Sequence, residues 1–123
     1  MNRTAMIVDD SRAMRLVMGR FLKALGYSVT EAGDGREALT KLQGCAEPFD
    51  FALVDWNMPE MDGISLVRAL RQDPRLHDLR VMMVTSEAEG DRVSTALEAG
   101  ADEYLMKPFT MESLADKLAV LGF

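Results

Sequence analysis

Residues 51–63 have the sequence FALVDWNMPEMDG, in which a short apolar run ends in a carboxylate, Asp55, before a turn-rich loop. An apolar run of this length is typical of a buried strand in a parallel sheet. A second apolar run, AMIV at residues 5–8, ends in the same way in Asp9 and Asp10. Ligands of open α/β sheets bind at the carboxyl ends of the strands, so these three carboxylates are candidates for one common site.

Three carboxylates that share a small space repel one another. At about 5 Å and an effective dielectric constant of about 20, each pair repels by about 3 kcal/mol. A divalent cation with oxygen ligands relieves that repulsion, so the cluster is a candidate metal site if the two strands are neighbours. An isolated pair such as Asp9 and Asp10 is more simply explained as a helix cap. Asp55, as the third carboxylate, favours the metal.

Apolar runs alternate with stretches of helical periodicity along the whole chain. The runs lie at residues 5–8, 28–31, 49–54, 81–84 and 103–106, and helices are expected after Ser11, after the turn at 33–35, after Asp62, from Asp91 and over 111–121. Apolar spacing predicts that Val17 and Leu97 face the core. We therefore expect one α/β domain over residues 1–123, a doubly wound five-stranded parallel sheet flanked by five helices. Four strands end in polar side chains, namely Asp9–Asp10, Asp55, Thr85 and Lys107.

Composition narrows the class of protein. The chain has 123 residues, a net charge of −6 and a single cysteine, Cys45, which excludes an internal disulfide and fits a reducing cytosol. It contains no apolar stretch long enough to span a membrane and no apolar leader, so we expect a cytoplasmic protein. The absence of a basic run disfavours direct binding to nucleic acid.

Four segments resemble those of response-regulator receiver domains, most closely the stand-alone chemotaxis (CheY-like) type. They are IVDDS at 7–11, VDWNMP at 54–59, VT at 84–85 and GADEYLMKPF at 100–109. The resemblance implies the flavodoxin-like strand order 2-1-3-4-5, in which the first and third strands flank the point where strand order reverses. It also implies a cis peptide bond between Lys107 and Pro108.

The resemblance further implies a phosphoacceptor site. Asp55 would take the phosphoryl group as a carboxylate nucleophile. Asp10 and Asp55 would hold Mg²⁺ together with the backbone carbonyl of Asn57, and Asp9 would help directly or through water. Lys107 would offset charge on the phosphoryl group.

In such domains a switch transmits the modification. Thr85 would donate a hydrogen bond to the phosphoryl group, and Tyr104 would then turn inward. Asn57 and Glu87 occupy positions that influence how long the phosphoryl group lasts.

The resemblance also implies partners. The donor would be a histidine kinase or a phosphotransfer protein, and a downstream protein, in chemotaxis or another phosphorelay, would bind the face formed by residues 91–121. We expect a monomer whose only catalysis is its own phosphorylation and dephosphorylation.

Two other hypotheses remain open from the sequence. A phosphatase of the haloacid dehalogenase type also uses an Asp nucleophile and Mg²⁺, but that class carries a second Asp where this chain has Asn57, and it usually has a cap domain. The chain could also be one domain of a longer regulator.

Overall fold

The computed structural model describes residues 3–45, 49–56, 58, 61–86 and 90–123, and strands and helices alternate strictly along them. The elements are β1 (Thr4–Val8), α1 (Arg12–Ala24), β2 (Ser28–Ala32), α2 (Gly35–Gly44), β3 (Phe51–Asp55), α3 (Gly63–Gln72), β4 (Arg80–Thr85), α4 (Gly90–Ala99), β5 (Glu103–Met106) and α5 (Met111–Val120). The five strands form one parallel sheet in the order β2-β1-β3-β4-β5. The predicted fold class and strand order are therefore confirmed.

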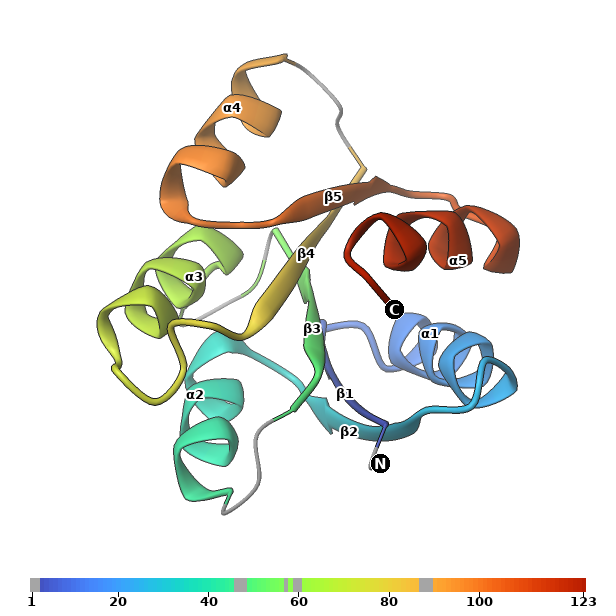
Figure 1. Ribbon diagram of the computed structural model, residues 1–123, viewed down its shortest axis with the longest axis horizontal. Helices are drawn as coiled ribbons and strands as arrows, with labels where there is room; N and C mark the ends of the chain where they lie inside the picture. The colour runs from blue at the N-terminus through green and yellow to red at the C-terminus, as the bar shows by residue number, and fades with distance from the viewer. Residues whose placement is uncertain (1–2, 46–48, 57, 59–60, 87–89) are drawn as a thin grey trace.

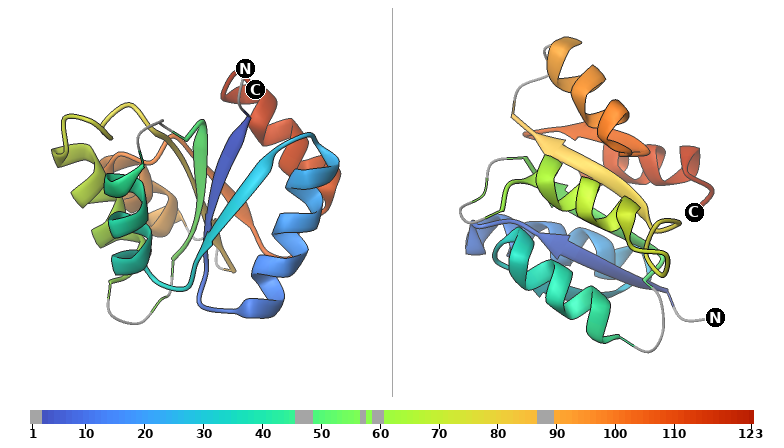
Figure 2. Two further views of the ribbon diagram at one scale, coloured as in Figure 1. Left: turned by 90° about the horizontal axis from the view of Figure 1, so that it is seen from below. Right: turned by 90° about the vertical axis from the view of Figure 1, so that its left-hand side faces the viewer.

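Helices cover both faces of the sheet, α1 and α5 on one side and α2, α3 and α4 on the other (Figures 1 and 2). Each face has its own apolar core, because successive side chains of a strand point to opposite faces. On β3, Leu53 joins the core under α1 and α5, whereas its neighbour Val54 joins the core under the other three helices. Both side chains are fully buried, as expected for strands covered on both faces.

Side-chain caps fix where several helices begin. The Ser11 hydroxyl accepts the Met14 backbone N–H at 3.2 Å, and the Asp62 carboxylate accepts the Ser65 backbone N–H at 2.8 Å, where the sequence predicted two of the helices to begin. The fourth helix begins at Gly90, one residue before Asp91. Because α1 begins at Arg12, shortly after β1 ends at Val8, the Ser11 cap also closes the short loop that carries Asp9 and Asp10.

Two predicted core positions are wrong. Val17 on α1 is 40% exposed and Leu97 on α4 is 49% exposed. Both lie at the edge of the apolar stripe of their helix, and the adjacent residues Met18 and Ala96 already fill the contact with the sheet. The third strand also begins at Phe51, two residues later than predicted, and it includes Asp55 as its last residue.

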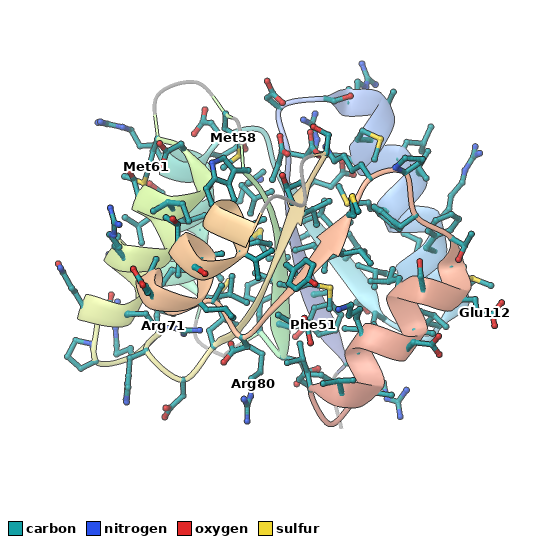
Figure 3. All side chains as sticks on the ribbon, turned by 90° about the horizontal axis from the view of Figure 1, so that it is seen from above. Phe51, Met58, Met61, Arg71, Arg80 and Glu112 are labelled. Atoms are coloured by element: carbon teal, nitrogen blue, oxygen red, sulfur yellow. The ribbon has the colours of Figure 1, made fainter. Side chains whose placement is uncertain are left out.

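Arg71 ties down the amino-terminal edge of the sheet, beside Arg80 in Figure 3. Its guanidinium donates to the Gly100 carbonyl oxygen at 2.9 Å and to Asp102 Oδ2 at 2.9 Å. Gly100 has a φ of +114°, which favours glycine, and Arg71 packs against it. Met58 and Met61, in the loop after β3, lie at the opposite edge. None of the helices in the described part of the chain has the length and apolar character needed to cross a bilayer.

Candidate functional site

The carboxyl ends of β1, β3, β4 and β5 bring the predicted polar residues to one edge of the sheet. Strand β1 pairs with β3 through Val8 and Val54, so Asp9 and Asp55 follow adjacent positions. Thr85, the last residue of β4, pairs with Met106 of β5, and Lys107 follows directly. The two strands that carry the carboxylates, β1 and β3, are therefore neighbours, as predicted.

Asp9, Asp10 and Asp55 form a compact carboxylate cluster. Each contributes one oxygen, and the three oxygens lie within 4.8 Å of one another. Asp9 is fully buried and Asp55 is 7% exposed, whereas Asp10 is exposed to solvent. One buried wall and one open side suit a site that must admit a ligand from solvent.

Lys107 supplies the positive charge that faces this cluster. Its Nζ lies 3.0 Å from Asp9 Oδ2 and 3.3 Å from Asp55 Oδ1. Burial lowers the pKa of the ammonium, but the hydrogen bond to Asp9 and the charges of Asp9 and Asp55 outweigh it, so the pKa lies above its ordinary value. The peptide bond that follows, between Lys107 and Pro108, is cis as predicted.

Besides Lys107, Asp9 makes hydrogen bonds with two residues at the start of α1. Its Oδ1 accepts the Ser11 backbone N–H at 2.8 Å, and its backbone carbonyl oxygen accepts a hydrogen bond from Arg15 Nη1 at 2.7 Å. Arg15 also bonds to Glu31 through Nε at 3.0 Å, which ties α1 to β2. Arg15 was not predicted from the sequence. The signal was a basic residue one turn after the Ser11 cap, facing the start of the helix.

The charge balance of the cluster remains negative. Burial, followed by the charge of Asp9, raises the pKa of Asp55, and Lys107 only partly offsets these effects. Among the residues that the structure describes, three carboxylates face one ammonium, so this cluster carries excess negative charge. Carboxylate oxygens with excess negative charge and an open side are the donor set that a hard divalent cation prefers.

The loop after Asp55 returns to the site through Gly63, the first residue of α3. A Cβ atom at this position would lie 2.4 Å from the Asp55 carbonyl oxygen and 2.7 Å from the Met83 methyl carbon. The Gly63 N–H donates to the Trp56 carbonyl oxygen at 3.0 Å, which closes the loop. From the sequence, Gly63 was expected only to belong to a turn. The signal was a glycine where most residues would form a better helix start.

The two residues predicted to form the switch lie on the neighbouring strands β4 and β5. Thr85 is 3% exposed, and its carbonyl oxygen accepts the Lys107 backbone N–H at 2.7 Å. Tyr104 is half-buried on β5, where it pairs with Met83. Asn57 and Glu87, which the resemblance gave roles in metal binding and phosphoryl lifetime, lie outside the described residues.

Residues 5–119 match the family model of the response regulator receiver domain. The chain belongs to this family. The match decides against the haloacid dehalogenase alternative and confirms the family suggested by the sequence motifs. Receiver domains take phosphoryl groups from histidine kinases and act on downstream proteins as phosphoacceptor switches.

Relatives and solved structures agree with this assignment. The receiver is 46% identical to the chemotaxis protein CheY of Pseudomonas aeruginosa over 114 residues, 92% of this chain and 90% of the relative. The chemotaxis response regulator CheY4 of Vibrio cholerae superposes with a TM-score of 0.91 at 34% identity, over 98% of this chain and 99% of the other. The receiver domain of a Pseudomonas aeruginosa sensor histidine kinase, with a magnesium ion in its active-site cleft, gives a TM-score of 0.87 at 29% identity, over 98% and 97% of the two chains.

The different environments of the carboxylates predict opposite effects of two Asp→Asn substitutions. In chelator, Asp10→Asn should raise the thermal stability of this receiver slightly, because it removes a like charge next to Asp55. Asp9→Asn should lower the free energy of unfolding by about 2 kcal/mol, because it weakens a buried, charge-assisted contact with Lys107. Thermal unfolding followed by circular dichroism measures both. A rise in stability in Asp9→Asn would contradict the stabilising contact of Asp9 with Lys107, and a fall in Asp10→Asn would contradict the like-charge repulsion.

Proposed function

We propose that this receiver accepts a phosphoryl group on Asp55 from a histidine kinase or a phosphotransfer protein. The observation that carries the proposal is the Asp55 carboxylate, which ends a buried strand 3.3 Å from the Lys107 ammonium and within the carboxylate cluster. Asp55 is reachable from the open side of the cluster, where Asp10 is exposed. A nucleophile, a neighbouring cation and an entry side are the parts that phosphoryl transfer to a carboxylate requires.

The transfer exchanges one bond for another. A carboxylate oxygen of Asp55 attacks phosphorus while the bond between phosphorus and the donor's imidazole nitrogen breaks, and that nitrogen keeps the bonding electrons. The product is an acyl phosphate on Asp55. Lys107 is placed to compensate charge on the phosphoryl oxygens, which is where the protein contributes most in such reactions. Attack of water on phosphorus later releases phosphate and restores the carboxylate, so the receiver also dephosphorylates itself.

The residues of the cluster fit Mg²⁺. Asp10 and Asp55 would hold the ion, and Asp9, which is already bonded to Lys107 and Ser11, would act mainly through water. Bound Mg²⁺ would offset the negative charge of the phosphoryl oxygens and share its remaining positions with water and substrate. Burial, followed by the charge of Asp9, raises the pKa of Asp55, and the excess negative charge of the cluster supports the metal.

The output of the modification is a change of partner binding, in chemotaxis or another phosphorelay. Thr85 would donate a hydrogen bond to the phosphoryl group, and Tyr104 would then change its rotamer. The partner would bind the face formed by α4, β5 and α5, which carries exposed apolar side chains on all three elements: Leu97, Met106 and Met111. Exposed apolar side chains are common at protein-binding surfaces. We expect the receiver to act as a monomer.

The test is phosphorylation with a small phosphodonor in the presence of Mg²⁺, followed by mass spectrometry of the intact protein and its peptides. One phosphoryl group should be incorporated, on the peptide that contains Asp55, and chelator should abolish the incorporation. Asp55→Asn should remain unlabelled, whereas the control Asp78→Asn, at an exposed site elsewhere, should be labelled as well as the unchanged protein. Stoichiometric labelling of Asp55→Asn would overturn the proposal.

A further inference from the structure

Tyr104 packs partly against the apolar core under α2, α3 and α4, and it also contacts polar groups of its own strand and of α5. Strand β5 runs between α4 and α5 (Figure 3). From α5, Lys117 places its Nζ 4.4 Å from the centre of the Tyr104 ring. The same Nζ lies 3.1 Å from Glu103 Oε1, and that oxygen also accepts the Tyr104 backbone N–H at 3.0 Å. The ammonium is thus fixed from two directions, by a carboxylate and by an aromatic face.

The burial of these groups distinguishes the arrangement from a solvated surface pair. The Glu103 side chain is 16% exposed and the Lys117 side chain is 32% exposed. A cation over an aromatic face gains stability as water is removed from it. Because Glu103 restrains Lys117, the ammonium loses little further freedom when it contacts the ring.

Strand β5 connects this arrangement to the phosphorylation site. Tyr104 pairs with Met83 of β4, and two residues further along Met106 pairs with Thr85. Lys107 follows directly, and its backbone N–H is bonded to Thr85. A rotamer change at Tyr104 therefore occurs on the same strand that leads into the phosphoryl-binding residues.

We propose that Lys117 is a positioning residue for Tyr104. Its ammonium, anchored by Glu103, stabilises the Tyr104 rotamer present in this structure and opposes the rotamer change that accompanies phosphorylation. The proposal rests on the proposed function for Asp55 and adds to it a brake that resides on α5. At an energy typical of a partly exposed cation–π contact, this contact raises the population of the observed Tyr104 rotamer relative to the other by about two- to fivefold.

Because coupling between sites is reciprocal, removing the brake should strengthen binding of a phosphoryl mimic. Lys117→Met keeps most of the aliphatic stem and removes the charge, so it should bind beryllofluoride about two- to fivefold more tightly in the presence of Mg²⁺. Lys117→Arg retains a cation that can contact both the ring and Glu103, and it should behave like the unchanged protein. Fluorescence of Trp56, the only tryptophan and a direct neighbour of Asp55, reports the titration.

Two further comparisons separate a specific effect from a general one. Lys41→Met removes a positive charge from a different ion pair, that with Glu37 on α2, and should leave beryllofluoride affinity unchanged. In a Tyr104→Leu background, which has no ring, Lys117→Met should have no effect on that affinity. A gain in affinity that persists without the ring would overturn the proposal.

Fluorine NMR observes the rotamer itself. The chain has two tyrosines, Tyr27 and Tyr104, so 3-fluorotyrosine labelling gives two resonances that Tyr27→Phe assigns. Lys117→Met should shift the Tyr104 resonance of the unmodified protein toward its position in the beryllofluoride complex. The role of Lys117 is overturned if Lys117→Met alters neither the Tyr104 resonance nor the beryllofluoride affinity, or only one of the two. The proposed function then still stands, provided that the wild-type protein binds beryllofluoride. If the wild-type protein does not bind beryllofluoride, the proposed function is overturned, and the role of Lys117, which rests on it, is overturned as well.

Discussion

Lys107→Met should slow phosphorylation of Asp55 by a small phosphodonor by about 10²-fold or more, the loss typical of removing one group that stabilises transition-state charge. The substitution keeps the length of the aliphatic stem and removes only the ammonium. In the structure that ammonium lies 3.3 Å from Asp55 Oδ1, beside the position where the phosphoryl oxygens would gather. The rate is measured by quenching the reaction at intervals and determining the phosphorylated fraction by mass spectrometry of the intact protein.

The same substitution should also destabilise the folded protein. Asp9 is fully buried and loses its cation, which leaves a buried charge without a counter-ion. Since the Lys107 side chain is itself 20% exposed and the Ser11 N–H still bonds to Asp9, we expect a loss of about 2 kcal/mol, below the range for fully buried pairs. Urea unfolding in chelator measures it, and adding Mg²⁺ should recover part of the loss, because an ion at the cluster replaces the missing positive charge.

Lys41→Met is the matched control, because it removes one ammonium from an exposed ion pair on α2. It should change stability by less than about 1 kcal/mol and leave the rate unchanged. A Lys107→Met protein that is phosphorylated as fast as this control would show that Lys107 takes no part in the transfer.

Much of the site could be predicted from the sequence because of one property of parallel sheets. All strands point the same way, so whatever residue follows each apolar run lies at the same edge. Asp9, Asp10, Asp55, Thr85 and Lys107 were located by this rule alone. The rule gives the edge but not the pairing: the sequence could not show that Lys107 bonds Asp9 as well as Asp55, because that depends on the path of the chain after β5.

Positions that depend on packing between elements were harder to predict. Val17 and Leu97 have helical spacing that favours burial, yet their exposure is set by how far the sheet extends beneath each helix. The contact of Lys117 with Tyr104 joins residues of α5 and β5 through side-chain geometry that periodicity does not encode. Gly63 belongs to the same class, because the space it needs is defined by Asp55 and Met83.

Gly63→Ala should lower the free energy of unfolding by about 2–3 kcal/mol, near the upper end of the usual penalty for overpacking. The added methyl carbon would lie 2.4 Å from the Asp55 carbonyl oxygen, which is backbone and cannot rotate away, and 2.7 Å from the Met83 methyl carbon. Alanine is the better helix former by about 1 kcal/mol, so the penalty appears in spite of a favourable change in helix propensity. The expected fall in Tm is about 10 °C.

The clash should also reduce phosphorylation, because relief requires the backbone of Asp55 to move and the loop closed by the bond from Gly63 to Trp56 to open. Gly19→Ala provides the control on the same protein. Gly19 lies buried in α1, where an added Cβ meets only Ile7 Cδ1 at 3.9 Å, so alanine should stabilise the receiver by about 0.5–1 kcal/mol and leave labelling of Asp55 unchanged. If both substitutions stabilise the protein, the close approach of α3 to the phosphorylation site does not constrain position 63. Opposite signs, with slower labelling only in Gly63→Ala, would show that this glycine is required because it lets α3 approach Asp55 so closely.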